Sequence, residues 1–243
     1  MNPVAFNLFG IDIRWYGILI ATGIFLGMHF SLKWAIKQGY KEDDMINLFI
    51  IVIPCAIIGA RFYYVIFNWS YYQGDFFKMI NTRLGGMAIH GGLIGGFLSG
   101  YLYCRYKKIN FYKLADIITP VIPLGQSIGR WGNFINQEAH GGPTNLPWGI
   151  MVDGVKVHPT FLYESVWDFC LFLFLLRLSK TKKYDGQILI YYACLYSVGR
   201  FFVEGLRTDS LMLGPLRMAQ VISLVIIFVG IILHKRFSKK IKK

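Results

Sequence analysis

The sequence predicts an all-helical integral membrane protein, with seven transmembrane helices in one domain that spans residues 1–243. Of these residues, 55% are hydrophobic and 16% are charged, whereas soluble domains typically have about 25% charged residues. The apolar residues form windows long enough to cross a bilayer, whose hydrocarbon core of about 30 Å needs roughly 20 helical residues. Seven such windows follow one another: 16–36, 45–67, 87–106, 114–132, 160–178, 187–204 and 216–234.

The basic residues between these windows indicate the orientation, because loops rich in Lys and Arg stay in the cytoplasm. We therefore expect the N-terminus outside and the C-terminus in the cytoplasm. The segments after the first, third, fifth and seventh windows are rich in basic residues: Lys33, Lys37, Lys41, Arg105, Lys107, Lys108, Lys113, Arg177, Lys180, Lys182, Lys183, Lys235, Arg236, Lys239, Lys240, Lys242 and Lys243. The other connections hold few: Arg14, Lys78, Arg83, Lys156, Arg207 and Arg217.

The residue patterns disfavour two other kinds of site. A formal net charge of +13 would suit nucleic acid, but the basic residues form no continuous stripe with interleaved aromatic residues. We therefore expect no nucleic-acid partner. The cysteines lack the paired spacing of a zinc site or a disulfide framework. They lie singly in apolar stretches: Cys55, Cys104, Cys170 and Cys194.

Three arginines, Arg61, Arg130 and Arg200, lie inside or at the end of apolar windows. A charge at the bilayer centre costs about 2.5–3.5 kcal/mol on insertion scales, so each arginine should face a cavity or a partner. The longest connections, about 68–86 and 133–159, both fall on the outer side. These features together indicate an anionic site toward the outside of the membrane.

The first motif that carries chemistry is HGGLIGG, which begins at His90. Its glycines form two overlapping GxxxG pairs, which let helix backbones approach closely. His90 itself suits proton transfer, because an imidazole titrates near neutral pH. A purely structural histidine is an equally weighted alternative.

The second motif is GRWGNFINQE, at the outer end of the fourth window. In a continuous helix Arg130, Asn133 and Gln137 share one face, and the planar guanidinium group suits phosphate recognition. The competing interpretation is an arginine that only joins helices, through an ion pair with Glu138 or Asp116.

Further polar residues lie at the outer ends of other windows. Arg200 and Glu204 are separated by four residues, a spacing that favours an ion pair within one helix. Glu164 lies in the first turns of the fifth window, where an acidic side chain stabilises a helix start and has a structural role. Tyr16, next to Trp15, is typical of an aromatic anchor at the membrane surface. Because all these positions map to one side, they can converge on an anionic lipid headgroup.

With these motifs in this order, the chain resembles the bacterial prolipoprotein diacylglyceryl transferases over nearly its whole length. The resemblance implies seven helices with a small extracytoplasmic cap, in the bacterial cytoplasmic membrane. It also implies transfer of the diacylglyceryl group of phosphatidylglycerol to the lipobox cysteine of a prolipoprotein, without a metal or other cofactor. The matching elements are Arg14-Trp15-Tyr16, His90-Gly91-Gly92-Leu93-Ile94-Gly95, Gly129-Arg130-x-Gly-Asn133-Phe-x-Asn136-x-Glu138, His158-Pro159 and Gly199-Arg200-x-x-x-Glu204.

The chemistry of such a reaction suggests a role for each residue. A thiolate must displace a phosphate ester, so the site has to deprotonate a thiol and stabilise the departing phosphate. We expect Arg130 and Arg200 on the phosphate and His90 as the base. The expected headgroup contacts are Tyr16, Asn133, Glu138 and Glu204, together with Arg130.

Two rival classes also place arginines inside a membrane. A lipid transporter or flippase usually has internal repeats and binds its substrate near the midplane, whereas here no repeat is detected and the polar motifs gather at one face. A structural or receptor-like protein would use the same charges only to pair helices. In that case Arg130→Lys should disturb stability before activity.

Overall fold

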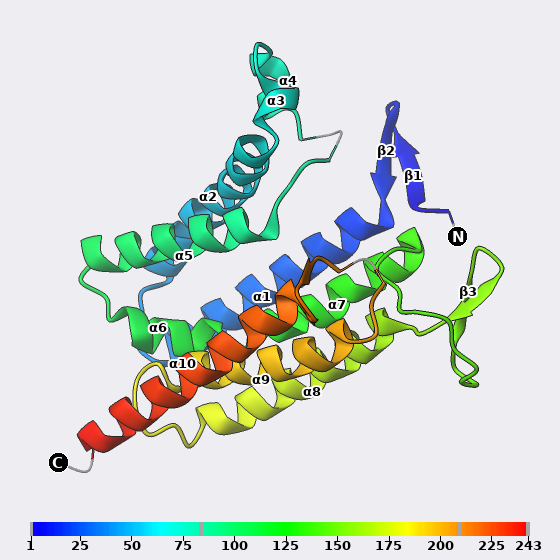
Figure 1. Ribbon diagram of the computed structural model, residues 1–243. Helices are drawn as coiled ribbons and strands as arrows, with labels where there is room; N and C mark the ends of the chain where they lie inside the picture. The colour runs from blue at the N-terminus through cyan, green and yellow to red at the C-terminus, as the bar shows by residue number, and fades with distance from the viewer. Residues whose placement is uncertain (1, 83–84, 209, 242–243) are drawn as a thin grey trace. The chain divides into compact units, whose positions relative to one another are not determined.

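A computed structural model describes residues 2–82, 85–208 and 210–241 (Figure 1). Arg83, Lys242 and Lys243, which contribute to the charge pattern, lie outside the described residues. The chain divides into two compact units, each described by itself: Met1–Ser31 with Ala115–Lys243, and Leu32–Leu114. The helices are α1 (Trp15–Lys37), α2 (Glu42–Phe67), α3 (Trp69–Tyr72), α4 (Phe76–Ile80), α5 (Ile89–Tyr106), α6 (Phe111–Ile118), α7 (Val121–Asn136), α8 (Thr160–Ser179), α9 (Gln187–Glu204) and α10 (Met218–Ile241).

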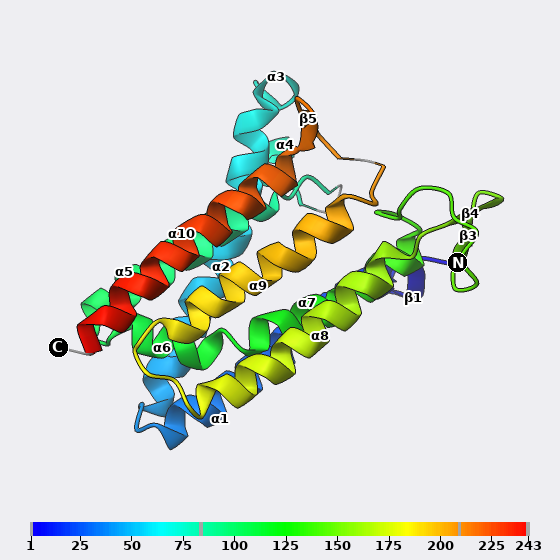
Figure 2. The same ribbon diagram turned by 60° about the horizontal axis from the view of Figure 1, so that its bottom comes forward.

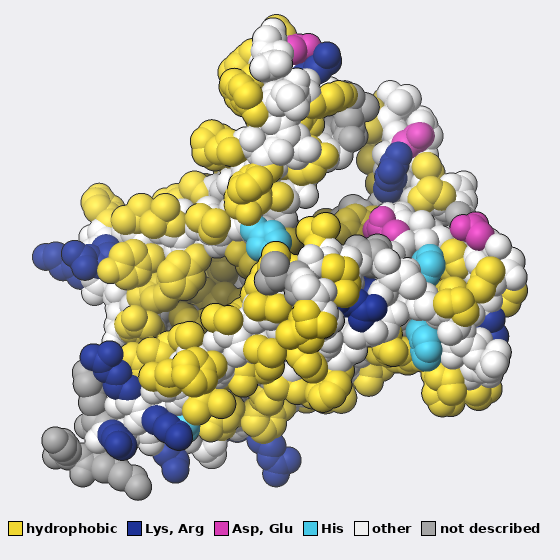
Figure 3. All heavy atoms as spheres, viewed as in Figure 1, with side chains coloured by type: hydrophobic (Ala, Val, Ile, Leu, Met, Phe, Trp, Pro, Cys, Tyr) yellow, Lys and Arg dark blue, Asp and Glu magenta, His cyan; other side chains and the backbone are white. Residues whose placement is uncertain are grey.

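Three of the described helices are long and apolar enough to cross a membrane by length and composition: α1, α2 and the segment Met218–Lys239 of α10. Their apolar side chains are largely unburied within the protein. Hydrophobic side chains cover the visible flank of α10, whereas Lys and Arg gather around its C-terminal end (Figure 3). An apolar helix surface of this kind is stable where lipid is the solvent, so the chain is a membrane protein.

The window 114–132, expected as one helix, is occupied by two. Helix α6 ends at Ile118, and α7 begins after Thr119 and Pro120. Proline has no N–H to donate and its ring clashes with the preceding turn, so Pro120 ends one helix and permits the start of the next. The fourth window is therefore a broken helix.

In the first unit, α7 packs against α8, α8 against α9, and α9 against α10. Figures 1 and 2 both draw these helices side by side. Glycines permit the close approach: the ring of Trp167 on α8 occupies the space beside Gly199 on α9. Likewise, the thiol of Cys194 on α9 lies where a side chain at Gly230 on α10 would be. This packing holds α7, α8, α9 and α10 together.

In the second unit, α5 packs along α2 through the glycines of the HGGLIGG motif. A Cβ on Gly91 would collide with the carbonyl oxygen of Gly59, and one on Gly95 with that of Cys55. Small residues at a helix contact are what lets two backbones approach this closely in a membrane. The prediction that these glycines serve helix packing is confirmed.

Arg61 on α2 is a correction to the sequence-based expectation. Its side chain is only 7% exposed, and its guanidinium group lies 4.9 Å from the ring centre of Tyr72. Arg61 stabilises the connection between α2 and α5 by donating hydrogen bonds to its backbone carbonyls. Because these carbonyls occupy the N–H donors of the guanidinium group, Arg61 is not available to an anion. The acceptors, 2.6–2.8 Å away, are the carbonyl oxygens of Lys78, Met79, Gly85 and Gly86.

The described residues also form three antiparallel hairpins that were not predicted from the sequence: one precedes α1, one joins α7 to α8, and one joins α9 to α10. In the second of them the turn residues Asp153 and Gly154 both have positive φ, 47° and 78°, as a tight two-residue hairpin requires. The pairs are β1 (Val4–Leu8) with β2 (Ile11–Arg14), β3 (Ile150–Val152) with β4 (Val155–Val157), and β5 (Met212–Leu213) with β6 (Leu216–Arg217).

Hydrogen bonds hold both ends of the connection from α7 to α8, which contains β3 and β4. The N–H of Gly141 donates to the carbonyl of His158 at 2.9 Å, and that of Gly142 donates to Leu206 at 3.0 Å. The hydroxyl of Thr160 at the start of α8 donates to the carbonyl of Ala139. These bonds tie the connection to α8 and to the segment that follows the C-terminal end of α9.

Candidate active site

Glu164, near the start of α8, is the centre of a buried ion-pair cluster. Its side chain is only about 7% exposed, and its Oε2 pairs with Nη2 of Arg130 from α7. Its Oε1 lies 3.1 Å from Nη1 of Arg200 on α9 and 3.8 Å from Nη1 of Arg207. One carboxylate thus gathers three guanidinium groups from α7, α9 and the segment after α9.

Arg200 makes a second ion pair, within its own helix. Its Nη2 pairs with Oε2 of Glu204, four residues further along α9, as the spacing predicts. Glu204 is itself buried. Arg200 is therefore held between two carboxylates and points toward Glu164.

The guanidinium groups of the cluster lie beside carboxylates of α8 and α9. Arg130, Arg200 and Arg207 face Glu164 and Glu204. Charge-assisted hydrogen bonds from guanidinium groups are strong and match the geometry of phosphate oxygens. The guanidinium groups of Arg130 and Arg200 are therefore suited to bind a phosphate group.

Two further residues complete the lining of this cluster. The hydroxyl of Tyr196 on α9 lies 3.4 Å from Nη2 of Arg130. Asp168, one turn beyond Glu164 on α8, is 2% exposed, and its Oδ2 has no hydrogen-bond partner within the described structure. A cavity of about 10 Å³ lies between Asp168, Tyr196 and Arg200, a space about the size of one water molecule.

The two alternative partners of Arg130 considered from the sequence are both wrong. Arg130 pairs with Glu164 instead. Asp116 on α6 lies 3.0 Å from Nζ of Lys182 and caps the start of α9. It accepts N–H bonds of 2.9–3.2 Å from Gly186, Ile188 and Leu189.

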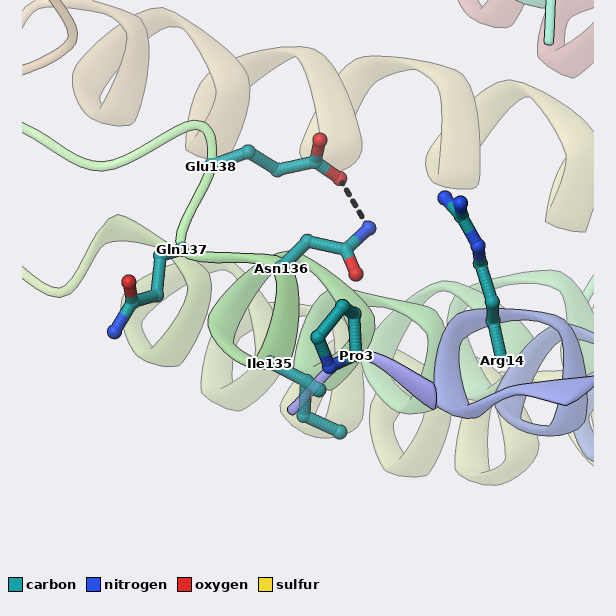
Figure 4. A pocket seen from close by; sticks show the side chains of 6 residues that line it. All are labelled: Pro3, Arg14, Ile135, Asn136, Gln137 and Glu138. Atoms are coloured by element: carbon teal, nitrogen blue, oxygen red, sulfur yellow. Dashed lines mark hydrogen bonds between the residues drawn. The ribbon is translucent and has the colours of Figure 1, made fainter. Parts of the chain in front are cut away.

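A second group of polar residues lies where α7 ends. Oε1 of Glu138 accepts hydrogen bonds from Nδ2 of Asn133 at 3.0 Å and from Nδ2 of Asn136 at 3.2 Å. Gln137 has left-handed backbone angles, φ 55° and ψ 37°, that end the helix, and its side chain points away from Glu138 (Figure 4). The expectation that Gln137 shares a face with Arg130 is therefore wrong.

Asn136, Gln137 and Glu138 border an open cavity of about 280 Å³. Arg14, at the end of β2, extends its guanidinium group on the same side as Asn136 and Glu138 (Figure 4). Pro3, Ile135 and Gln137 complete the lining. The cavity combines a cation, an anion and an amide.

Tyr16 and His90 occupy different surroundings. The ring of Tyr16 on α1 lies against Gly132 on α7, where a Cβ would collide with the ring. His90 belongs to the second unit, is exposed in the first turn of α5, and lies 6.0 Å from the ring centre of Tyr63. The first unit thus brings together Arg130, Arg200 and Glu204, and separately Asn133 and Glu138.

The sequence analysis assigned no role in the site to Tyr196 or Asp168 and gave Glu164 only a structural role. The available signal was the presence of Glu164 and Asp168 four residues apart in one apolar window, since acidic residues inside a membrane helix usually face a functional cavity. Within the described part of the chain, no group of His, Cys, Asp and Glu side chains could hold a metal ion.

A model of the family described as prolipoprotein diacylglyceryl transferase matches residues 3–235. The chain is 64% identical to the phosphatidylglycerol--prolipoprotein diacylglyceryl transferase of Clostridioides difficile (strain 630), with 100% of this chain and 98% of the relative covered. Proteins with the same description are 52% identical in Finegoldia magna, over 100% of this chain and 98% of the relative, and 49% identical in Bacillus cytotoxicus, over 96% and 90%. The chain therefore belongs to the prolipoprotein diacylglyceryl transferase family.

Proposed function

We propose that this protein transfers the diacylglyceryl group of phosphatidylglycerol to the thiol of the lipobox cysteine in prolipoproteins, the first step of lipoprotein maturation. The observation that carries the proposal is the convergence of Arg130, Arg200 and Arg207 on Glu164. Family membership supplies the reaction class, and this cluster supplies a place for the lipid phosphate.

The reaction forms one carbon–sulfur bond and breaks one carbon–oxygen bond. The cysteine thiolate attacks the glyceryl carbon that bears the phosphate, and the electron pair of the broken bond stays on the phosphate oxygen. The products are a thioether and glycerol 1-phosphate, and the thiol proton passes to a base. The site must therefore stabilise growing negative charge on the phosphate.

Arg130 and Arg200 perform this task in the proposed mechanism. Glu164 holds both guanidinium groups in place, so little reorganisation is needed when a phosphate arrives beside them. Glu204 holds the other terminal nitrogen of Arg200, Nη2, in an ion pair. The phosphate then shares the guanidinium donors of Arg130 and Arg200 with Glu164 and Glu204.

The end of α7 suits the glycerol headgroup. Glu138 and its two amide partners, Asn133 and Asn136, offer acceptors and donors for hydroxyl groups. The ring of Tyr16 packs on Gly132, two residues after Arg130 on α7. Its phenolic hydroxyl is proposed to add a hydrogen bond to the headgroup. His90 is proposed as the base for the thiol, because imidazole accepts a proton near neutral pH.

We also propose seven crossings, with the N-terminus outside, the C-terminus in the cytoplasm and the active site toward the extracytoplasmic side of the bacterial cytoplasmic membrane. The long apolar helices α1, α2 and α10 support three of these crossings. Helices α6 and α7 would form the fourth together, and α5, α8 and α9 the others. The charge pattern of the loops supports the orientation.

The test is a transfer assay with the purified protein in lipid nanodiscs. Phosphatidylglycerol and a lipobox peptide should give a peptide with one added diacylglyceryl group and an equal amount of glycerol phosphate. A Cys→Ser peptide and phosphatidylethanolamine nanodiscs should give none, and Arg130→Ala should lose the activity while Arg177→Ala, at the other end of α8, keeps it.

Absence of any peptide modification by folded protein would overturn the proposal. Movement of labelled lipid between leaflets without peptide modification would instead favour a flippase.

A further inference from the structure

The open cavity at the end of α7 contains a cation that the proposed mechanism does not use. Arg14 lines this cavity with Asn136 and Glu138 (Figure 4). None of the ion pairs in the described part of the chain involves Arg14. Its guanidinium group is therefore free to meet an anion from outside the chain.

Polar residues of α7 lie between the arginine cluster and this cavity. Asn133 lies three residues beyond Arg130 and so on the same face of α7. Asn133 donates to Glu138, and Glu138 also accepts from Asn136 in the cavity wall. With a rise of 1.5 Å per helical residue, Asn136 lies about 9 Å along the axis from Arg130. The cavity is thus the next polar region beyond the cluster.

The phosphate gains negative charge during the proposed reaction, and this gain suggests a role for the cavity in product release. A phosphate diester carries a single negative charge, whereas a phosphate monoester carries about −1.5 to −2 at pH 7. The arginine cluster therefore attracts the product more strongly than the substrate, because the Coulomb energy grows with charge. Without a second cation outside the cluster, release of the product would be slow.

We infer that the cavity formed by Arg14, Asn136 and Glu138 is an exit site, in which Arg14 receives the phosphate monoester as it leaves the arginine cluster. This inference rests on the proposed function. The carboxylate of Glu138 shares the cavity and repels the same anion, so the site binds weakly and passes the product on. Its open form suits a soluble product that moves into water.

The phosphate that Arg14 binds could belong to the incoming lipid headgroup or to the departing product. Comparing single-turnover with multiple-turnover rates distinguishes these two. The experiment uses full-length protein in phosphatidylglycerol nanodiscs with a lipobox peptide, for wild type, Arg14→Gln, Arg14→Lys and the control Lys156→Gln. Thioether formation is followed in a single turnover, with enzyme in excess, and over many turnovers, with peptide in excess. Inhibition by added glycerol 1-phosphate is measured in parallel.

For Arg14→Gln we expect an unchanged single-turnover rate and a kcat about fivefold lower, with a burst of product in the first turnover. The size corresponds to one partly exposed charge interaction. Arg14→Lys should recover most of kcat, and Lys156→Gln, on the β3–β4 hairpin, should match wild type. The pattern of glycerol 1-phosphate inhibition should change in Arg14→Gln and not in the control.

Two results would overturn the exit site. An equal fall in the single-turnover rate, or a higher KM for phosphatidylglycerol with kcat unchanged, would assign Arg14 to the incoming headgroup. A kcat equal to that of wild type would remove any role for Arg14. Failure of the proposed function itself is distinct, because the wild-type protein would then form no thioether at all.

Discussion

The carboxylate of Glu164 on α8 lies 3.1 Å from the guanidinium group of Arg200 on α9, although the two residues are 36 positions apart. The other oxygen of the same carboxylate pairs with Arg130 on α7. A single side chain therefore sets the relative positions of the two arginines assigned to the phosphate. Its removal tests both the structure and the chemistry.

Replacement of Glu164 by Gln should lower both activity and stability. The variant leaves the part-buried Arg130 without its carboxylate partner and Arg200 with Glu204 alone, and breaking a buried pair typically costs about 3–5 kcal/mol. We expect a lower midpoint of thermal unfolding in nanodiscs and a fall in kcat of at least about tenfold. Both are measured on one preparation by fluorescence and by peptide mass.

Glu42→Gln, in the exposed first turn of α2, is the matched control and should change neither property. A Glu164→Gln protein with wild-type kcat would show that the arginines find their positions without this carboxylate.

Substitution of Arg130 by Lys should reduce activity more than it reduces stability. Lysine keeps the charge and can still reach Glu164, but it lacks the planar fork that binds two phosphate oxygens. We expect kcat/KM to fall by about 100-fold, while the unfolding midpoint stays close to that of wild type. The reverse order, lost stability with full activity, would return Arg130 to a helix-pairing role.

Replacement of His90 by Asn tests the proposed base. An amide retains hydrogen bonding but cannot accept the thiol proton, so the rate should fall by about 100-fold to 10,000-fold. His140→Asn, in the connection after α7, serves as control, and an unchanged rate in His90→Asn would exclude this base.

Asp116→Asn should destabilise the protein without changing the chemistry. Asp116 joins α6 to the start of α9 through three backbone N–H groups and Lys182. Burial lowers the pKa of Lys182, the hydrogen bond to Asp116 raises it, and the net effect is an increase, so Lys182 is a cation at neutral pH. The loss should cost about 1–3 kcal/mol.

The unfolding midpoint of Asp116→Asn should fall below that of Asp185→Asn, which removes only the more exposed partner of Lys182. The kcat of the folded fraction should equal that of wild type. A selective loss of kcat would contradict a purely structural role for Asp116.

Local patterns in the sequence predicted those contacts that lie within one helix or along one helix face. The Arg200–Glu204 pair follows from a spacing of four residues, and the close packing of Gly91 and Gly95 follows from GxxxG. The ion pair depends on the geometry of one helix alone, whereas GxxxG predicts a close helix contact without predicting that α2 supplies it.

Contacts between helices were not predictable in the same way. Which carboxylate meets Arg130 depends on how α7 and α8 pack, so Glu138 and Asp116 were reasonable partners until Glu164 was found there. The left-handed residue Gln137 likewise ends α7, a feature that side-chain periodicity does not reveal. The break at Pro120 was also missed, although a proline within an apolar window is a visible signal.

The fastened base of the α7–α8 connection has a consequence for protein engineering. Gly154, at the tip of its hairpin, has open space around it, while the bonds of Gly141 and Gly142 close the loop below. Exposed hairpin tips tolerate chain breaks when the surrounding backbone remains bonded. A chain divided after Asp153 should therefore assemble from two separately expressed halves, with α7 supplied by one fragment and α8 and α9 by the other.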